Sequence, residues 1–207
     1  PIYIHFSMTC TSDGSPVFST GTGLYGLTED GKHAIAGIHE HLNELLAVYA
    51  GSPVSQLRLS PDSWSGASAC WGLENREAAI RFCAATKGNP LGANVELKCG
   101  DLSANPYYAI GCILGSALDG IAKRIPLAKE TTVNPALLTE DERRERNVRR
   151  LPSTYDEVTE AFSRSMFARE LLGEEVVDAE LVIRRLMSST YADTSPEELA
   201  RKMRFTW

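Results

Sequence analysis

Three arginines and one acid stand out between residues 58 and 98, because their neighbours are residues that suit a protein core. Arg58, Arg76 and Arg81 lie among apolar, small and glycine residues, as does Glu96. Moving a guanidinium group out of water costs several kcal/mol unless a carboxylate or phosphate meets it. The planar guanidinium fork binds either anion through paired hydrogen bonds. This stretch therefore predicts an anion site, filled by a carboxylate of the protein or by a substrate.

The elements that would hold these residues include two short strands, predicted from the alternation of polar and apolar residues. Near the start of the chain, Tyr3 and His5 share one face of a strand, because successive side chains point to opposite sides. Glu96 and Lys98 share one face of a second strand in the same way. Each strand therefore presents one polar face.

Helices are predicted where apolar residues recur at intervals of three and four. Such a stripe covers residues 32–50 and stops before Gly51. A second helix is predicted over residues 106–122, because Pro106 suits a first helical turn. Nearly all of its residues are small or apolar, so we expect this helix to be buried. With further helices in the C-terminal part, the pattern predicts an α+β fold of short antiparallel strands backed by helices.

The sequence contains no cluster with the spacing of a zinc site. Its five cysteines are widely spaced and form no C-x-x-C pair, which indicates reduced thiols. His39 and His41 are two residues apart, so on a helix they project about 200° apart and cannot share a metal. We expect both histidines to lie on the surface.

The composition is that of an ordinary globular protein. Of the 207 residues, 43% are hydrophobic and 23% are charged, which is enough for one large domain or two small ones. The formal net charge of −6 argues against binding to nucleic acid or to anionic membranes, since both favour a cationic surface. No apolar run approaches the roughly 20 residues of a membrane helix, and no signal peptide is recognisable. Together with the reduced cysteines, this predicts a cytoplasmic protein.

Four motifs follow one another between residues 58 and 121. They are Arg58-Leu59-x-Pro61, Trp71-Gly72-x-x-Asn75-Arg76-x-x-x-x-Arg81, Glu96-x-Lys98-x-x-Asp101-x-x-Ala104-Asn105-Pro106-Tyr107 and Leu118-Asp119-Gly120-Ile121. In their order and spacing, these motifs resemble the C-terminal catalytic region of glutamine synthetases. The resemblance covers most of the chain and implies the α+β catalytic region of that family. We expect residues 1–130 to form its strand-and-helix core and residues 131–207 a helical C-terminal segment of the same domain.

The resemblance implies an ATP-dependent carbon–nitrogen ligase. In this chemistry ATP phosphorylates the side-chain carboxylate of glutamate, and ammonia or an organic amine then displaces the phosphate. Fixed guanidinium groups and Mg²⁺ or Mn²⁺ stabilise the negative charge that phosphoryl transfer spreads over oxygens. The family also implies a homo-oligomeric ring with active sites between subunits. The alternative is a non-catalytic scaffold or binding protein that keeps the fold.

The resemblance also implies roles for individual residues by their position. Arg58 would hold the glutamate carboxylate, Arg76 the transferred phosphoryl group and Arg81 the nucleotide phosphates. His5 matches a histidine that lies near the nucleotide, and Glu96 matches a ligand of the magnesium or manganese ion. Spacing alone favours ordinary ion pairs, for instance between Arg81 and either Glu74 or Glu96, and the resemblance reverses that preference.

Four positions depart from the family pattern. Tyr3 stands where the family has a metal-binding histidine, and phenol is a poor magnesium ligand near neutral pH. Asn94 and Lys98 replace two arginines, and Lys98 keeps a charge for the substrate without the fork. Trp64 replaces a glutamate that helps to deprotonate ammonium in ammonia-using members. We interpret Trp64 either as part of an apolar pocket for an organic amine or as a packing residue.

The chain begins at Pro1 rather than at a methionine. It also lacks the metal ligands and the small N-terminal domain that the family carries upstream. We therefore expect a fragment that holds part of an active site and does not turn over by itself.

Overall fold

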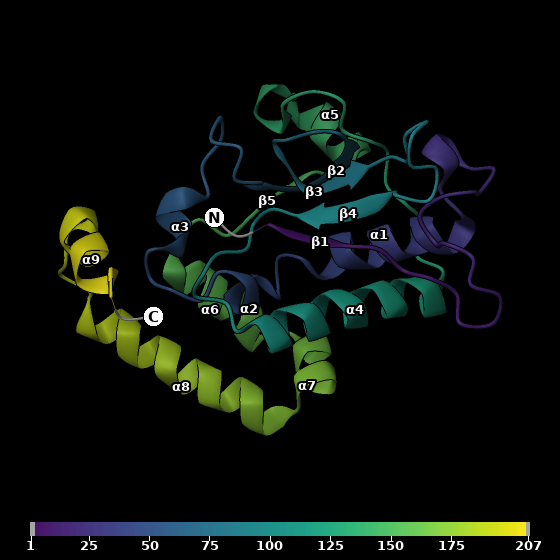
Figure 1. Cartoon of the computed structure of the whole chain (residues 1–207). Coiled ribbons are helices and arrows are strands. Elements are labelled where there is room, and N and C mark those ends of the chain that lie inside the picture. Colours follow the sequence, from purple (N-terminus) through teal and green to yellow (C-terminus); the bar gives the residue numbers. More distant parts are fainter. Residues whose placement is uncertain (1–2, 206–207) are drawn as a thin grey trace.

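A computed structural model describes residues 3–205 and shows the predicted α+β fold. Helices cover one face of a five-stranded sheet (Figure 1). The strands lie in the order β1-β4-β3-β2-β5, and neighbouring strands are antiparallel except for the parallel pair β2 and β3. The strands are β1 (Ile4–Phe6), β2 (Ser68–Leu73), β3 (Ala78–Cys83), β4 (Asn94–Leu97) and β5 (Arg149–Arg150).

The helices form a layer beneath the sheet and continue away from it towards the C-terminus (Figure 1). α1 contacts β2 of the sheet, α4 packs along α1, and α6 and α7 contact α2 and α4 respectively. The helices are α1 (Glu29–His41), α2 (Leu46–Tyr49), α3 (Ser55–Arg58), α4 (Pro106–Lys123), α5 (Glu140–Glu145), α6 (Tyr155–Ser163), α7 (Met166–Leu172), α8 (Glu174–Thr190) and α9 (Pro196–Met203).

The two predicted strands pair with each other, as β1 and β4. In this register His5 lies opposite Glu96, and Glu96 lies opposite Arg81 of β3. Because side chains alternate between the two faces of a strand, the three side chains form a row on one face. Their apolar neighbours Phe6 and Val95 pack on the core side. The register thus brings together residues that are far apart in the chain.

The helix predicted over residues 32–50 is interrupted. α1 starts at Glu29, after Thr28 caps it by accepting a hydrogen bond from Gly31 N. It ends at His41, and the chain turns before α2 begins. At the turn Leu45 adopts φ −97° and ψ 1°, which departs from helical geometry, and its side chain is completely buried. The prediction of one continuous helix was therefore wrong, because the bend directs the second half of the stripe into the core.

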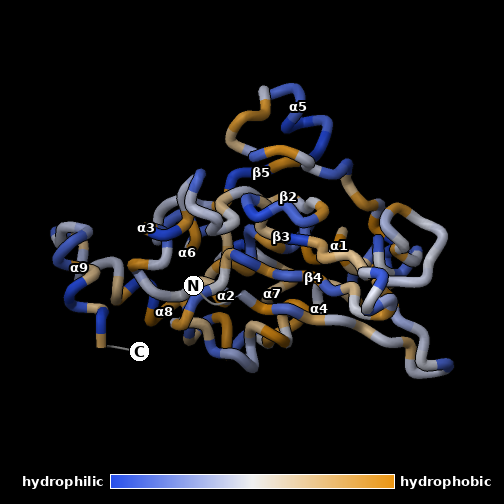
Figure 2. Tube along the Cα trace, turned by 45° about the horizontal axis from the view of Figure 1, so that its top comes forward, coloured by the Kyte–Doolittle hydropathy of each residue, from blue (hydrophilic) through white to orange (hydrophobic). Residues whose placement is uncertain are grey.

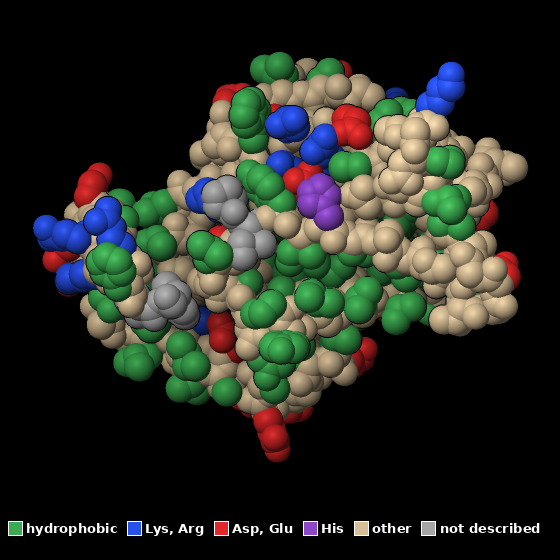
Figure 3. All heavy atoms as spheres, in the orientation of Figure 1, with side chains coloured by type: hydrophobic (Ala, Val, Ile, Leu, Met, Phe, Trp, Pro, Cys, Tyr) green, Lys and Arg blue, Asp and Glu red, His purple; other side chains and the backbone are tan. Residues whose placement is uncertain are grey.

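α4 begins where the sequence predicts, with Pro106 in its first turn and Asn105 Oδ1 accepting a hydrogen bond from Tyr107 N at 3.0 Å. It crosses α1 very closely, since a Cβ atom on Gly37 would lie 2.1 Å from Ser116 O. The expectation of a buried helix was wrong for its outer side, because α4 packs along one face only. Hydrophobic side chains gather on the surface over α4 (Figure 3). The exposed ones include Tyr107, Ile110, Leu114 and Leu118.

The C-terminal helices extend the core and then leave it. Val158 and Phe162 of α6 are fully buried with Val177 and Leu181 of α8. Hydrophilic residues dominate α9 at the end of the chain (Figure 2). Within residues 3–205, no helix is long and apolar enough to cross a membrane.

Candidate active site

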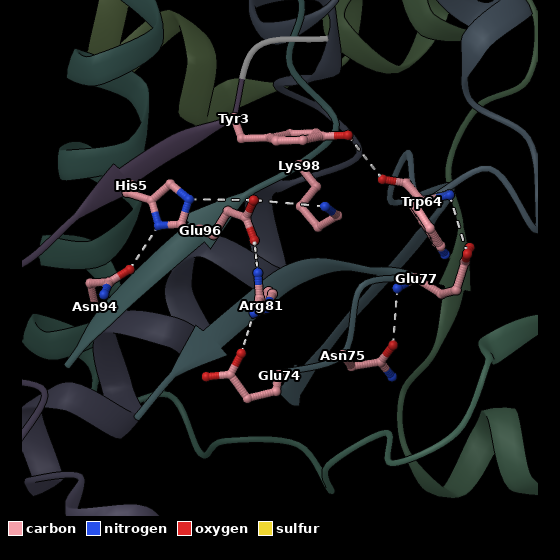
Figure 4. A network of polar contacts seen from close by, with 10 residues as sticks. All are labelled: Tyr3, His5, Trp64, Glu74, Asn75, Glu77, Arg81, Asn94, Glu96 and Lys98. Atoms are coloured by element: carbon pink, nitrogen blue, oxygen red, sulfur yellow. Dashed lines mark hydrogen bonds and ion pairs between the residues drawn. The ribbon is translucent and has the colours of Figure 1, made fainter. Parts of the chain in front are cut away.

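A row of charged side chains crosses one face of the sheet, on β1, β4 and β3 (Figure 4). The Glu96 carboxylate, 2% exposed, lies at its centre. Its Oε2 accepts a hydrogen bond from Arg81 Nη1 at 3.2 Å, and its Oε1 lies 3.4 Å from His5 Nε2 and 3.7 Å from Lys98 Nζ. Positively and negatively charged side chains, with a histidine among them, gather on this side of the molecule (Figure 3). Both carboxylate oxygens are therefore engaged by protein groups.

Arg81 is held between two carboxylates, because it also donates a hydrogen bond to Glu74. Burial lowers the pKa of Arg81, but its bonds to Glu74 and Glu96 more than offset this and raise the pKa above its ordinary value. The ion pairs favoured by spacing alone are thus present in the structure. One of the three arginines finds its anion within the protein.

Lys98 and Tyr3 lie side by side at the end of this row (Figure 4). The Lys98 side chain is only 4% exposed, and its Nζ lies 3.9 Å from the centre of the Tyr3 ring. Burial lowers the pKa of the Lys98 ammonium from its ordinary value, although Glu96 acts in the opposite direction. The Tyr3 hydroxyl points away from Glu96 and donates a hydrogen bond to Trp64 O at 3.3 Å.

Arg58, at the end of α3, has hydrogen-bond donors that lack an acceptor. Its Nη2 donates to Cys99 O at 2.8 Å and to Gly100 O at 3.0 Å, the two carbonyl groups that follow Lys98 in the chain. Its Nε and Nη1 are buried and have no hydrogen-bond partner within residues 3–205. Buried donors without a partner cost free energy until an acceptor reaches them. Arg58 therefore keeps two donors for which this part of the protein supplies no acceptor.

Arg76 and Trp64 form the exposed rim of the site. Arg76 lies in the turn between β2 and β3, is exposed, and places its guanidinium carbon 5.8 Å from the centre of the Trp64 ring. Trp64 is 59% exposed and has a left-handed backbone, with φ 52°. Its N–H donates to Glu77 Oε1 at 3.2 Å, so both backbone groups of Trp64 are tied, to Glu77 and to Tyr3. The loop thus presents an aromatic ring to solvent from a fixed backbone.

The structure brings the predicted residues together around one sheet face. His5, Arg81, Glu96 and Lys98 share a continuous network, and Tyr3 links it to the Trp64 loop (Figure 4). Arg76 joins through the Trp64 ring and Arg58 through the carbonyl groups after Lys98. Sequence reasoning missed Glu77, which holds the Trp64 loop. Only its position directly after Arg76 in the sequence could have indicated that Glu77 lies near the site.

His39 and His41 are buried, so the prediction that they lie on the surface was wrong. His39 Nε2 donates to Ala69 O at 3.1 Å across the contact of α1 with the sheet. His41 lies between the carboxylates of Glu44 and Asp119 and stacks on the Phe167 ring at 3.6 Å. Each imidazole is buried because a polar partner satisfies it. The two rings do project to different neighbours, as their spacing predicts.

The residues around Glu96 do not fit a divalent metal. Within residues 3–205, no group of three or more His, Cys, Asp or Glu side chains is placed to hold a metal ion. Mg²⁺ prefers several oxygen ligands at near-octahedral positions. Glu96 instead has one arginine, one lysine and one histidine against its two oxygens.

The structure is thus an α+β domain in which guanidinium groups surround a buried acid on one face of the sheet. A family model described as "Glutamine synthetase, catalytic domain" matches residues 2–201. The chain belongs to the glutamine synthetase catalytic-domain family, which confirms the predicted family and fold.

The chain is similar in sequence and structure to named proteins of this family. The chain is 40% identical over 181 residues to gamma-glutamylpolyamine synthetase GlnA3 of Streptomyces coelicolor, with 87% of this chain and 39% of that protein covered. It is 33% identical over 199 residues to a glutamine synthetase of Methanosarcina mazei, with 96% and 44% covered. A solved structure, described as a novel glutamine synthase homolog, superposes with a TM-score of 0.83 at 31% identity, covering 99% of this chain and 45% of that one. The chain thus spans less than half the length of these relatives.

Proposed function

We propose that the protein containing this chain is an ATP-dependent carbon–nitrogen ligase that activates glutamate as γ-glutamyl phosphate and transfers the glutamyl group to an amine. The observation that carries this proposal is Arg58, whose two buried donors lack a partner inside a glutamine synthetase catalytic domain. A carboxylate oxygen of glutamate that reached this guanidinium would supply an acceptor that the protein itself does not provide. The names of the relatives agree with this class of ligase.

The proposed reaction has two steps, in which oxygen and phosphorus atoms are conserved. A γ-carboxylate oxygen of glutamate attacks the terminal phosphorus of ATP, and ADP leaves. The amine nitrogen then attacks the acyl carbon and loses a proton, and inorganic phosphate leaves with the former carboxylate oxygen. Arg76 is exposed at the rim, free to stabilise charge on the transferred phosphoryl group.

Arg81 and His5 remain the residues proposed to face the nucleotide, and Lys98 a residue proposed to face the substrate. Arg81 is bound by Glu74 and Glu96, so a nucleotide phosphate would have to displace or share one of these partners. His5 is the more accessible group, since half of its side chain is exposed. A divalent metal neutralises nucleotide phosphates when bound, as the family implies. Glu96 as its ligand stays a prediction that its surroundings do not favour.

For the acceptor, we propose an organic amine rather than ammonia. The exposed Trp64 ring offers apolar surface at the rim of the site. Apolar surface favours the alkyl part of an organic amine, which ammonia lacks. A relative whose name specifies a polyamine as substrate supports this choice.

A non-catalytic scaffold or binding protein is the second candidate. It is favoured by the ion pairs of Arg81 with Glu74 and Glu96, which neutralise these charges without a ligand. Under either candidate we propose a cytoplasmic protein, and for the ligase a homo-oligomeric ring, as the family resemblance implies.

Glutamate-dependent release of ADP separates the two candidates. The complete protein that contains this chain is supplied with ATP, Mg²⁺, glutamate and either ammonia or one of a panel of primary amines and polyamines. The ligase proposal predicts ADP release that requires both glutamate and an amine, with organic amines preferred. Folded protein that binds ATP but releases no ADP with any acceptor would instead support the scaffold.

A further inference from the structure

The cations next to the Glu96 carboxylate are side chains of the protein itself. We infer that the Lys98 ammonium, seated against Glu96 and covered by the Tyr3 ring, takes the place of a divalent metal at this position. The inference rests on the proposed ligase site, but its test measures metal binding and requires no turnover.

The first observation is that both oxygens of the Glu96 carboxylate already face basic side chains of the protein. Arg81 Nη1 lies 3.2 Å from Oε2, while Lys98 Nζ and His5 Nε2 lie 3.7 Å and 3.4 Å from Oε1. Glu96 is 2% exposed and the Lys98 side chain 4% exposed. A metal at Oε1 would have to enter between the carboxylate and an ammonium already buried beside it. Two cations at such a short distance repel each other strongly in a poorly solvated site.

The second observation is that Tyr3 suits an ammonium and does not suit a metal. Its ring centre lies 3.9 Å from Lys98 Nζ, and the face of an aromatic ring attracts a cation at this range. Its hydroxyl, the only atom that could ligate a metal, donates instead to Trp64 O.

The two substitutions are complementary. β1 and β4 are antiparallel with Ile4 opposite Leu97, so Tyr3 and Lys98 come next to each other on the polar face. The tyrosine supplies a ring above the lysine, and the lysine supplies the charge that the buried carboxylate requires. Removing one partner of such a buried pair would leave an uncompensated charge. The pair thus provides a permanent cation at the position where the resemblance places an exchangeable one.

Counting bound Mn²⁺ on the complete protein tests the inference. Free Mn²⁺ is measured by electron paramagnetic resonance, without nucleotide or glutamate, for the unaltered protein and for Glu96→Gln. We expect both to bind the same number of Mn²⁺ ions per chain. A number that falls by one in Glu96→Gln would overturn the inference, because Glu96 would then be a metal ligand.

The double variant Tyr3→His/Lys98→Met tests whether the Lys98 ammonium is what keeps a metal away from Glu96. It removes the ammonium and supplies an imidazole, so we expect one additional Mn²⁺ per chain, lost again when Glu96→Gln is added. No gain of Mn²⁺ would overturn the inference, since Lys98 would not be what excludes the metal. The matched control is Tyr107→His/Lys87→Met, the same changes at two exposed positions. Circular dichroism tests whether each variant folds. If the double variant does not fold, the single variant Lys98→Met is compared with the unaltered protein. We then expect Lys98→Met to bind Mn²⁺ more tightly, and unchanged Mn²⁺ binding would overturn the inference.

Discussion

At the scale of single residues, the proposal of an anionic substrate depends chiefly on Arg58. Two of its three nitrogens are buried without a partner, while the third is fixed by the carbonyl groups of Cys99 and Gly100. The guanidinium is thus oriented before any ligand arrives, which reduces the entropy lost on binding. A lysine at this position would keep the charge and lose the fork.

We predict that Arg58→Lys raises the KM for glutamate by about tenfold to a hundredfold, since a hydrogen bond to a charged group contributes about 1.5–3 kcal/mol. The KM for ATP should change much less. Steady-state kinetics of the complete protein measure both constants, with Arg185→Lys on the exposed side of α8 as the matched control. Equal effects on the two substrates would contradict the assignment of Arg58 to glutamate.

We propose that Trp64 determines which acceptor the enzyme prefers in the proposed reaction. Replacing it with glutamate removes the ring and introduces a carboxylate, which favours ammonium over an alkyl amine. For Trp64→Glu we predict that the ratio of kcat/KM for organic amine to that for ammonia falls about tenfold or more, a change of about 1.4 kcal/mol. Trp64→Phe, which keeps an aromatic ring, should retain the preference. An unchanged ratio in Trp64→Glu would mean that Trp64 is a packing residue.

The sequence showed which charged residues lie among core residues, but not whether each one is paired within the protein. Arg58, Arg81 and Glu96 could be singled out because charged side chains among core residues require partners. Whether the partner is a substrate or another side chain depends on strand register, which sequence does not give. Thus Arg81 and Glu96 are paired inside the protein, while Arg58 is not.

At the scale of elements, the crossing of α1 and α4 positions the helical layer beneath the site. Gly37 and Gly120 meet there, and a Cβ atom on Gly37 would lie 2.1 Å from Ser116 O. Backbone atoms on α4 cannot yield as a flexible side chain would. The helices therefore approach to a distance that only glycine permits.

We predict that Gly37→Ala lowers the free energy of unfolding by about 1–3 kcal/mol or more, because the added methyl group forces the helices apart. Gly111→Ala is the matched control, since Gly111 lies on α4 with no atom within 4 Å of its added Cβ. The control should gain about 0.5–1 kcal/mol from helix propensity alone. Urea unfolding of both variants measures the difference. Equal effects would show that the crossing tolerates a side chain.

The elements differ in how well the sequence predicts them. β1, β4 and α4 follow directly from alternation and from the Asn105-Pro106 start. The bend after His41 does not, because the apolar stripe runs through it without a Gly or Pro. The buried histidines were also missed, since their partners Ala69 and Asp119 are distant in the chain.

At the scale of the whole molecule, stability should depend on His39 under acidic conditions. Burial, and to a lesser extent Arg149, lowers the pKa of His39 to about 4 from its ordinary 6.5. Between these values the unfolded chain takes up a proton that the folded protein excludes. The contribution of neutral His39 to stability is therefore present above pH 6.5 and is lost as the pH falls towards 4.

We predict that this residue accounts for about 3 kcal/mol of the stability lost between pH 6.5 and pH 4, at 1.36 kcal/mol per pKa unit. Urea unfolding across this range should show a flatter pH profile for His39→Gln, which removes the titrating group. Parallel profiles for the two proteins would mean that His39 takes up its proton without unfolding.

The family and fold class of the whole molecule could be predicted, because four motifs in order leave little room for chance. The division of the domain at residue 130 and the ring assembly stay predictions.

The transfer of oxygen from glutamate to phosphate tests the proposed ligase most directly. The complete protein is given ATP, an amine and glutamate labelled with ¹⁸O in its side-chain carboxylate, and the phosphate released is analysed by mass spectrometry. Because phosphate leaves with the oxygen through which glutamate attacked, we predict one ¹⁸O atom in each phosphate, together with a γ-glutamyl amide. Phosphate without label would show that ATP is hydrolysed by water, and would contradict the formation of γ-glutamyl phosphate.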